Sequence, residues 1–254
     1  MNKVYNSSDG QLFRQDRLAT RPLTLVLGAR CKDGVVLVAD TKVIINDGER
    51  YDYVQKIFTP LAHLVFACAG SSDMFQVLDG HLREYIRDHP DTTFENVTGR
   101  LREILFDINR QNNFRPELTI EALVANAPDD KPAFLTWFNA FGGIRPIEDA
   151  CLIGVGRTYA STFLNNLFSE GTVDTPMIKL AELGYFSIKY IEKFKLDLRV
   201  GVGRGKPSIH FIPDRHLRNK WDFNLKPHEM KKLGNKIKEK LEIYNVQFTK
   251  LFNS

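Results

Sequence analysis

The sequence predicts an α+β fold built as a four-layer αββα sandwich, in which helices, sheet, sheet and helices are stacked. Strand-like segments and segments of helical periodicity occur in blocks, in the order strands, two helices, strands, two helices, strands. A doubly wound parallel sheet would instead require strict alternation of strand and helix. The chain is also long enough for one large domain with a substantial core, since 43% of its 254 residues are hydrophobic.

The first block of strands begins with a hairpin. Residues 24–31 and 35–42 are apolar and rich in β-branched side chains, and the Asp33-Gly34 pair between them is a strong signal for a tight turn. Two more extended segments are expected at about 54–58 and 63–69. These segments complete the first predicted block.

Two helices are predicted next. The first begins just after Gly70, where apolar residues recur at helical spacing, namely Phe75, Leu78, Leu82 and Ile86. The second covers about 93–109 and starts with Thr93, which is followed three residues later by Asn96. Its apolar face consists of Val97, Leu101, Ile104, Leu105 and Ile108.

The second half of the domain repeats this arrangement. Three strands that we expect to form a meander are followed by two helices, and two short strands close the core. The predicted strands cover 118–126, 133–141, 150–155, 198–203 and 208–212, and the predicted helices cover 159–168 and about 174–194.

The basic character of the chain is concentrated in its last segment. The whole chain carries a net charge of +4, whereas from Asp214 onward ten Lys and Arg stand against five Asp and Glu, a charge of +5. A helix over about 227–248 is predicted here, with apolar residues on one face and lysines on the other.

Composition argues against several classes of function. Three scattered cysteines do not suit a disulfide framework or a Cys-x-x-Cys metal site, and the six histidines lack metal-ligand spacing. No glycine-rich phosphate loop occurs, so nucleotide chemistry has no support in the sequence. We expect neither a metal nor an organic cofactor. We also expect a cytoplasmic protein without a membrane partner, because no apolar run has the length of a membrane span or a signal peptide.

Three motifs carry a resemblance to a known family. They are GARCKDGVVLVADTKV, beginning at Gly28, YVQKIF, beginning at Tyr53, and VFACAGS, beginning at Val65. In these motifs the chain resembles the first third of a 20S proteasome subunit of the β type, within the N-terminal nucleophile hydrolase superfamily. The resemblance runs without a gap from Thr24 to about Asp73 and is weaker through residue 212. It implies the αββα fold and assembly into a homo-oligomeric or hetero-oligomeric ring.

The resemblance also implies roles for individual residues. Thr24 resembles the catalytic threonine, Asp40 and Lys56 resemble the charged pair beside it, and Gly70 resembles the glycine whose N–H helps form the oxyanion hole. Asp197 is the only residue that could match the aspartate of a second family element. An interior threonine lacks a base, but cleavage before Thr24 would free an α-amine with a pKa near 8. The implied activity is that of a threonine-type peptidase acting on peptides or unfolded proteins.

Departures from the family pattern leave a second hypothesis open. Leu23 stands where self-processing members have glycine, and Val155 stands where active members have a serine between two glycines. The second family element has a serine after its aspartate, but the segment that follows Asp197, residues 198–205, contains none. These features favour a catalytically inactive ring subunit. In that case Thr24 opens a strand, Asp40 and Lys56 form a structural ion pair, and Gly70 ends a strand.

A third hypothesis concerns the basic tail, which could bind nucleic acid or a protein partner. Its aromatic residues suit an apolar packing seam at least as well as base stacking, so packing is favoured over nucleic acid. We divide the chain into a propeptide or N-terminal extension at 1–23, a proteasome-like αββα domain at 24–213 and a basic C-terminal helical extension at 214–254.

Overall fold

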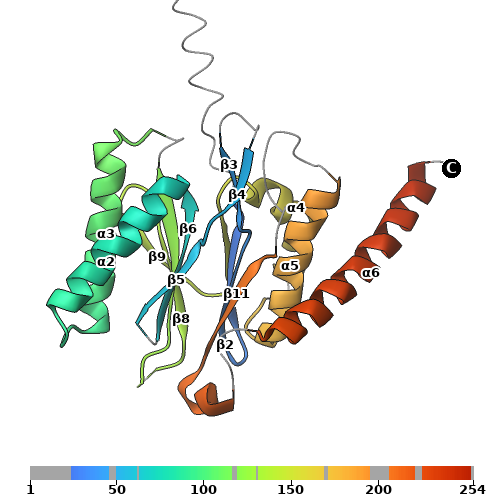
Figure 1. The fold of residues 1–254 in the computed structure, drawn as a ribbon. Coiled ribbons are helices and arrows are strands. Elements are labelled where there is room, and N and C mark those ends of the chain that lie inside the picture. Colours follow the sequence, from blue (N-terminus) through green and yellow to red (C-terminus); the bar gives the residue numbers. More distant parts are fainter. Residues whose placement is uncertain are drawn as a thin grey trace, which may run out of the picture.

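Four layers of secondary structure are stacked as two helices, a sheet, a second sheet and two helices (Figure 1). The pairings within both large sheets are antiparallel, which confirms the predicted α+β sandwich. The computed structural model describes residues 24–45, 50–61, 63–115, 119–129, 131–168, 171–194, 206–220 and 225–252.

The first sheet has four strands in the spatial order β10-β1-β2-β11. They are β1 (Val26–Cys31), β2 (Gly34–Ala39), β10 (Ala150–Ile153) and β11 (Ser208–Pro213). Strands β1 and β2 form the predicted hairpin, in which Val26 pairs with Ala39 and Cys31 with Gly34. This register places the start of β1 beside the end of β2.

The second sheet has five strands in consecutive order, as a meander. They are β5 (Ile57–Leu61), β6 (Leu64–Gly70), β7 (Ile120–Asn126), β8 (Phe134–Phe138) and β9 (Ile144–Ile147). Sequence reasoning missed β9 because it contains Pro146 and its first three residues are exposed, so it has no apolar alternation.

One predicted strand was assigned to the wrong sheet. The segment 150–155 was expected to continue the meander, but β10 crosses to the first sheet, where Cys151 pairs with Gly28 of β1. Side-chain periodicity identifies a strand without identifying its partner, so the error concerns only the pairing. The predicted strand at 198–203 lies outside the described residues.

A separate two-stranded sheet was not predicted. It consists of β3 (Lys42–Ile45) and β4 (Arg50–Tyr53), which pair antiparallel just after the first hairpin. The expected strand at 54–58 therefore begins later, at Ile57, where β5 starts.

Helices cover the outer face of each large sheet (Figure 1). The second sheet is covered by α2 (Ser72–Asp88) and α3 (Phe94–Gln111), and the first by α4 (Arg157–Phe168) and α5 (Met177–Phe194). As predicted, Thr93 caps α3, since its hydroxyl accepts a hydrogen bond of 3.3 Å from Asn96 N–H.

Three apolar layers hold these elements together. On β2, Val36 and Val38 face the helices, whereas Val35 and Leu37 face the other sheet. A third layer joins the second sheet to α2 and α3. Both faces of β1 and β2 are therefore buried, which explains their continuous apolar sequence. Each large apolar side chain buried in this way contributes roughly 1.5–3 kcal/mol.

The helix α6 (Pro227–Phe252) forms an additional outer layer against α5 (Figure 1). Its Leu233, Ile237 and Leu241 are buried in the same apolar cluster as residues of α5. Lys236 Nζ also pairs with Glu182 at 2.6 Å. The predicted amphipathic helix is confirmed, and its described apolar face packs on its own domain.

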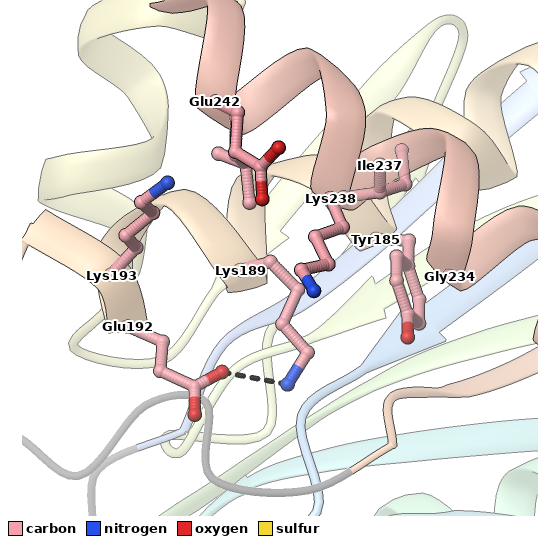
Figure 2. A pocket seen from close by; sticks show the side chains of 9 residues that line it. Tyr185, Lys189, Glu192, Lys193, Gly234, Ile237, Lys238 and Glu242 are labelled. Atoms are coloured by element: carbon pink, nitrogen blue, oxygen red, sulfur yellow. Dashed lines mark hydrogen bonds and ion pairs between the residues drawn. The ribbon is translucent and has the colours of Figure 1, made fainter. Parts of the chain in front are cut away.

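A groove of about 440 Å³ lies between α5 and α6 (Figure 2). Tyr185, Ile237 and Leu241 contribute buried side chains to it, and lysines and glutamates from both helices line its walls. None of its lining residues belongs to the motifs that carry the family resemblance.

Candidate active site

Thr24 lies two residues before β1, where β10 ends and the chain turns into α4. It is buried, and its carbonyl oxygen accepts a hydrogen bond of 3.1 Å from Gly156 N–H. A Cβ atom on Gly154 would lie 2.2 Å from the same oxygen, and Gly154 has φ +86°. The turn at residues 154–157 therefore packs its backbone directly on Thr24.

Asp40 follows the end of β2 and is joined to the residue next to Thr24. Its carboxylate Oδ1 accepts a hydrogen bond of 2.8 Å from Leu25 N–H. Its own N–H donates to the Leu25 carbonyl at 3.1 Å. The hairpin register thus places Asp40 opposite Leu25, the residue that follows Thr24.

Lys56 completes a buried ion pair with Asp40. Its Nζ lies 3.0 Å from each oxygen of the Asp40 carboxylate and 2.8 Å from the Lys42 carbonyl oxygen. Both residues are 1% exposed. The Lys56 carbonyl accepts a hydrogen bond of 2.9 Å from Cys68 N–H, which ties the lysine to β6. Within the described residues, the hydrogen bonds of the Lys56 ammonium do not include the Thr24 hydroxyl.

Burial controls the electrostatics of this pair. Loss of hydration lowers the pKa of the Lys56 ammonium from its ordinary value, although the Asp40 carboxylate opposes this shift. Loss of hydration also raises the pKa of Asp40, against the effects of Lys56 and of the Leu25 and Lys42 N–H groups. A lysine with a lowered pKa gives up its proton more readily than a solvated lysine.

Gly70 ends β6, and its backbone conformation and close surroundings leave no room for a side chain. Its φ is +125°, and a Cβ atom here would lie 2.0 Å from the Thr119 carbonyl oxygen. The preceding residue, Ala69, has its Cβ 3.2 Å from the Cβ position of Gly154, so this strand end lies close to the turn beside Thr24. The role of the Gly70 N–H as an oxyanion donor stays a prediction.

Two residues from the sequence-based site lie outside the described residues, namely Leu23 and Asp197. Val155 lies in the turn beside Thr24, with its side chain 41% exposed. It therefore supplies no hydroxyl at the place where the family pattern has one.

Sequence reasoning missed Glu121, which lies on β7 and contacts the same turn. Its Oε1 accepts a hydrogen bond of 3.0 Å from Gly154 N–H, and its Oε2 accepts one of 3.0 Å from Trp137 Nε1. No motif marks this residue, because its role depends on the two sheets facing each other. The pairing of Glu121 with Ala69 puts it on the strand next to β6.

Asp40 and Lys56 form a buried ion pair that is hydrogen-bonded to the residue following Thr24. A hydroxyl, a carboxylate and an amine are groups that can take part in acyl transfer. Among the described residues no group of three His, Cys, Asp or Glu side chains could hold a metal ion. In the same part of the chain, no helix has both the length and the apolar character of a membrane span.

Two facing antiparallel sheets covered by helices define the N-terminal nucleophile hydrolase fold. The family model described as "Proteasome subunit" matches residues 24–195, which is more than half of the chain. The chain therefore belongs to the proteasome subunit family. The match begins at Thr24 itself.

A solved structure supports the fold assignment. The chain is similar to Anbu (ancestral beta-subunit) from Yersinia bercovieri, with a TM-score of 0.68 and 14% sequence identity. The similarity covers 91% of this chain and 97% of that chain, and at this identity it shows the fold alone. The comparison with curated proteins gave no significant match.

Proposed function

We propose that this chain is a threonine-type peptidase whose nucleophile is Thr24, freed by self-cleavage of the Leu23–Thr24 bond. The observation that carries the proposal is the buried Asp40–Lys56 ion pair, which is hydrogen-bonded to Leu25 directly beside Thr24. The proposed substrates are peptides and unfolded proteins in the cytoplasm.

The chemistry follows from the groups at the site. The Thr24 hydroxyl oxygen attacks the peptide carbonyl, and its proton passes to the freed α-amine, whose pKa lies near 8. Lys56 favours loss of that proton through its positive charge, and Asp40 holds the lysine in place. The Gly70 N–H would stabilise the oxyanion. The protonated α-amine passes this proton to the nitrogen of the leaving amine. Water then hydrolyses the resulting ester, which releases the acyl part as a carboxylic acid and restores Thr24.

A second candidate is an inactive ring subunit of the same family. It is favoured by the hydrogen bonds of Lys56, which go to Asp40 and Lys42, and by Val155 in the turn beside Thr24. Proteasome-family subunits typically form rings, and we infer a ring of identical or mixed subunits under either candidate function.

Intact mass provides the first test. The purified wild-type chain is expected to lose residues 1–23, whereas Thr24→Ala should keep them, because self-cleavage requires the threonine hydroxyl. If both chains keep the segment, self-processing is excluded. If both lose it, another protease performs the cleavage.

A second preparation separates processing from catalysis. A chain with Thr24 at its N-terminus can be made by cleaving a fusion partner, and then treated with an electrophile that reacts with the threonine hydroxyl and α-amine. Mass addition at Thr24 is expected, with none in the Thr24→Ala chain. Absence of reaction in the chain that begins with Thr24 would support the inactive subunit.

A further inference from the structure

We propose that Glu121 is a positioning residue for Thr24, acting through the turn at residues 154–157. This inference rests on the proposed function, because a positioning residue matters only if Thr24 reacts. Glu121 does not belong to the charged pair or to any motif described above. Its contacts nevertheless connect it to Thr24 through a single backbone segment, the turn at residues 154–157.

The contacts form a continuous path from the second sheet to Thr24. Trp137 Nε1 on β8 donates to Glu121 Oε2, and Gly154 N–H donates to Glu121 Oε1, both at 3.0 Å. Two residues further along, Gly156 N–H donates to the Thr24 carbonyl at 3.1 Å. The Glu121–Gly154 bond therefore links the second sheet to the turn that follows β10 of the first sheet.

Among the described residues, few other hydrogen bonds hold the turn at residues 154–157 in this position. Its side chain at 155 is a valine that is 41% exposed, so it offers no hydrogen bond. The backbone bonds of the turn run to Thr24 and into α4, since Arg157 N–H donates to Gly154 and Ala160 N–H donates to Gly156. Glu121 supplies the link from the turn to the facing sheet.

A carboxylate suits this task better than a neutral acceptor. Both N–H groups point at it, and a carboxylate accepts from both, whereas an amide has only one acceptor oxygen. Hydrogen bonds to a charged acceptor are also stronger than those between neutral groups. Glutamine at position 121 would turn an NH₂ group toward one of two donors.

The experiment uses Glu121→Gln, Trp137→Phe and the double variant, each prepared with Thr24 at the N-terminus. Reaction of Thr24 with the electrophile should slow by about 10- to 100-fold in Glu121→Gln, because small displacements of reacting groups carry penalties of this order. Amide hydrogen exchange at residues 153–157 should become faster. The double variant should recover most of the rate, since the amide oxygen can accept from Gly154 while its NH₂ meets a phenyl ring.

A matched control is Asp214→Asn. Asp214 Oδ1 also accepts a hydrogen bond from a backbone N–H, that of Ala133 at 2.7 Å, but Asp214 follows the far end of β11. This variant should keep the wild-type rate. It reports what replacing a carboxylate that accepts a backbone N–H with an amide does to the fold alone.

The outcomes separate this inference from the proposed function. If wild type reacts and Glu121→Gln reacts equally fast, or loses rate only in proportion to unfolded protein, the positioning role is wrong. If wild type does not react, the proposed function fails, and exchange at 153–157 still decides whether Glu121 holds the turn. Unchanged exchange in Glu121→Gln would overturn the inference in either case.

Discussion

Asp40 and Lys56 are buried charged residues, and burying a charge costs free energy that other interactions must offset. Moving each charge out of water costs several kcal/mol in a real protein. The structure offsets this cost with hydrogen bonds, because the Lys56 ammonium meets three acceptor oxygens and the Asp40 carboxylate meets the Leu25 N–H. A well-packed apolar pair would be as stable or more stable. The pair is therefore, by itself, no sign that this region is especially stable.

Removing one member of the pair should be strongly destabilising. Lys56→Met leaves the buried Asp40 carboxylate without its counter-charge, and the free energy of unfolding should fall by about 3–5 kcal/mol. Asp40→Asn should also lower the free energy of unfolding, because it leaves the buried Lys56 ammonium without its counter-charge. The double variant Asp40→Asn/Lys56→Met should lose clearly less than the sum of the two single variants. Urea unfolding at neutral pH measures all three.

An exposed ion pair supplies the control for that comparison. Arg100 and Glu103 on α3 pair at 3.0 Å with side chains 42% and 65% exposed. Glu103→Gln should change the unfolding free energy by less than about 1 kcal/mol. Additive losses in the Asp40 and Lys56 variants would show that the buried charges are not coupled.

The two helices on the second sheet begin in different ways, although each has a hydroxyl residue at its N-cap. Thr93 accepts a hydrogen bond from Asn96 N–H at the start of α3. Ser71 precedes α2 without a side-chain capping hydrogen bond. The same residue class therefore has a stabilising contact at one helix and lacks it at the other.

This difference predicts unequal effects of alanine. Thr93→Ala should lower the unfolding free energy by about 1 kcal/mol, because it removes the acceptor for an N–H of the first turn. Ser71→Ala should have an effect close to zero, since no capping bond is lost. Thermal unfolding of both variants beside wild type tests this, and equal losses would refute the assigned difference in capping.

The molecule as a whole combines the sandwich of its family with the outer layer formed by α6. The family match ends at residue 195, whereas α6 starts at Pro227 and packs its apolar face on α5. This packing favours a stabilising role for the basic tail over nucleic-acid binding. The five lysines of α6 whose side chains the structure describes are exposed, namely Lys231, Lys232, Lys236, Lys238 and Lys240.

Two isoleucines on α6 test the packing of this layer. Ile237 is 1% exposed and Ile243 is 58% exposed. Ile237→Ala should lower the unfolding free energy by about 2–5 kcal/mol through lost burial and a cavity. Ile243→Ala should change it by about 0.5 kcal/mol or less. Comparable losses at both positions would mean that the exposed face of α6 is covered in the protein in solution, for example by another subunit.

Local sequence was sufficient for the helices, for most strands and for the first hairpin. Helices and most strands are encoded by side-chain periodicity, and the turn signal at Asp33-Gly34 sets the hairpin register that aligns residues 25 and 40. Thr24, Asp40 and Lys56 were singled out through the family resemblance. Nothing in the sequence around Lys56 shows that its side chain reaches Asp40.

Contacts between distant segments required the folded structure. The partner of β10, the pairing of β9 and the path from Trp137 through Glu121 to Gly154 depend on how two sheets face each other. Periodicity along one strand reports which face is buried, but it carries no information about which strand lies across from it. The hairpin that brings Asp40 beside Leu25 was therefore predictable from the sequence, whereas the contacts between Glu121, Trp137 and Gly154 were decided by packing between the layers.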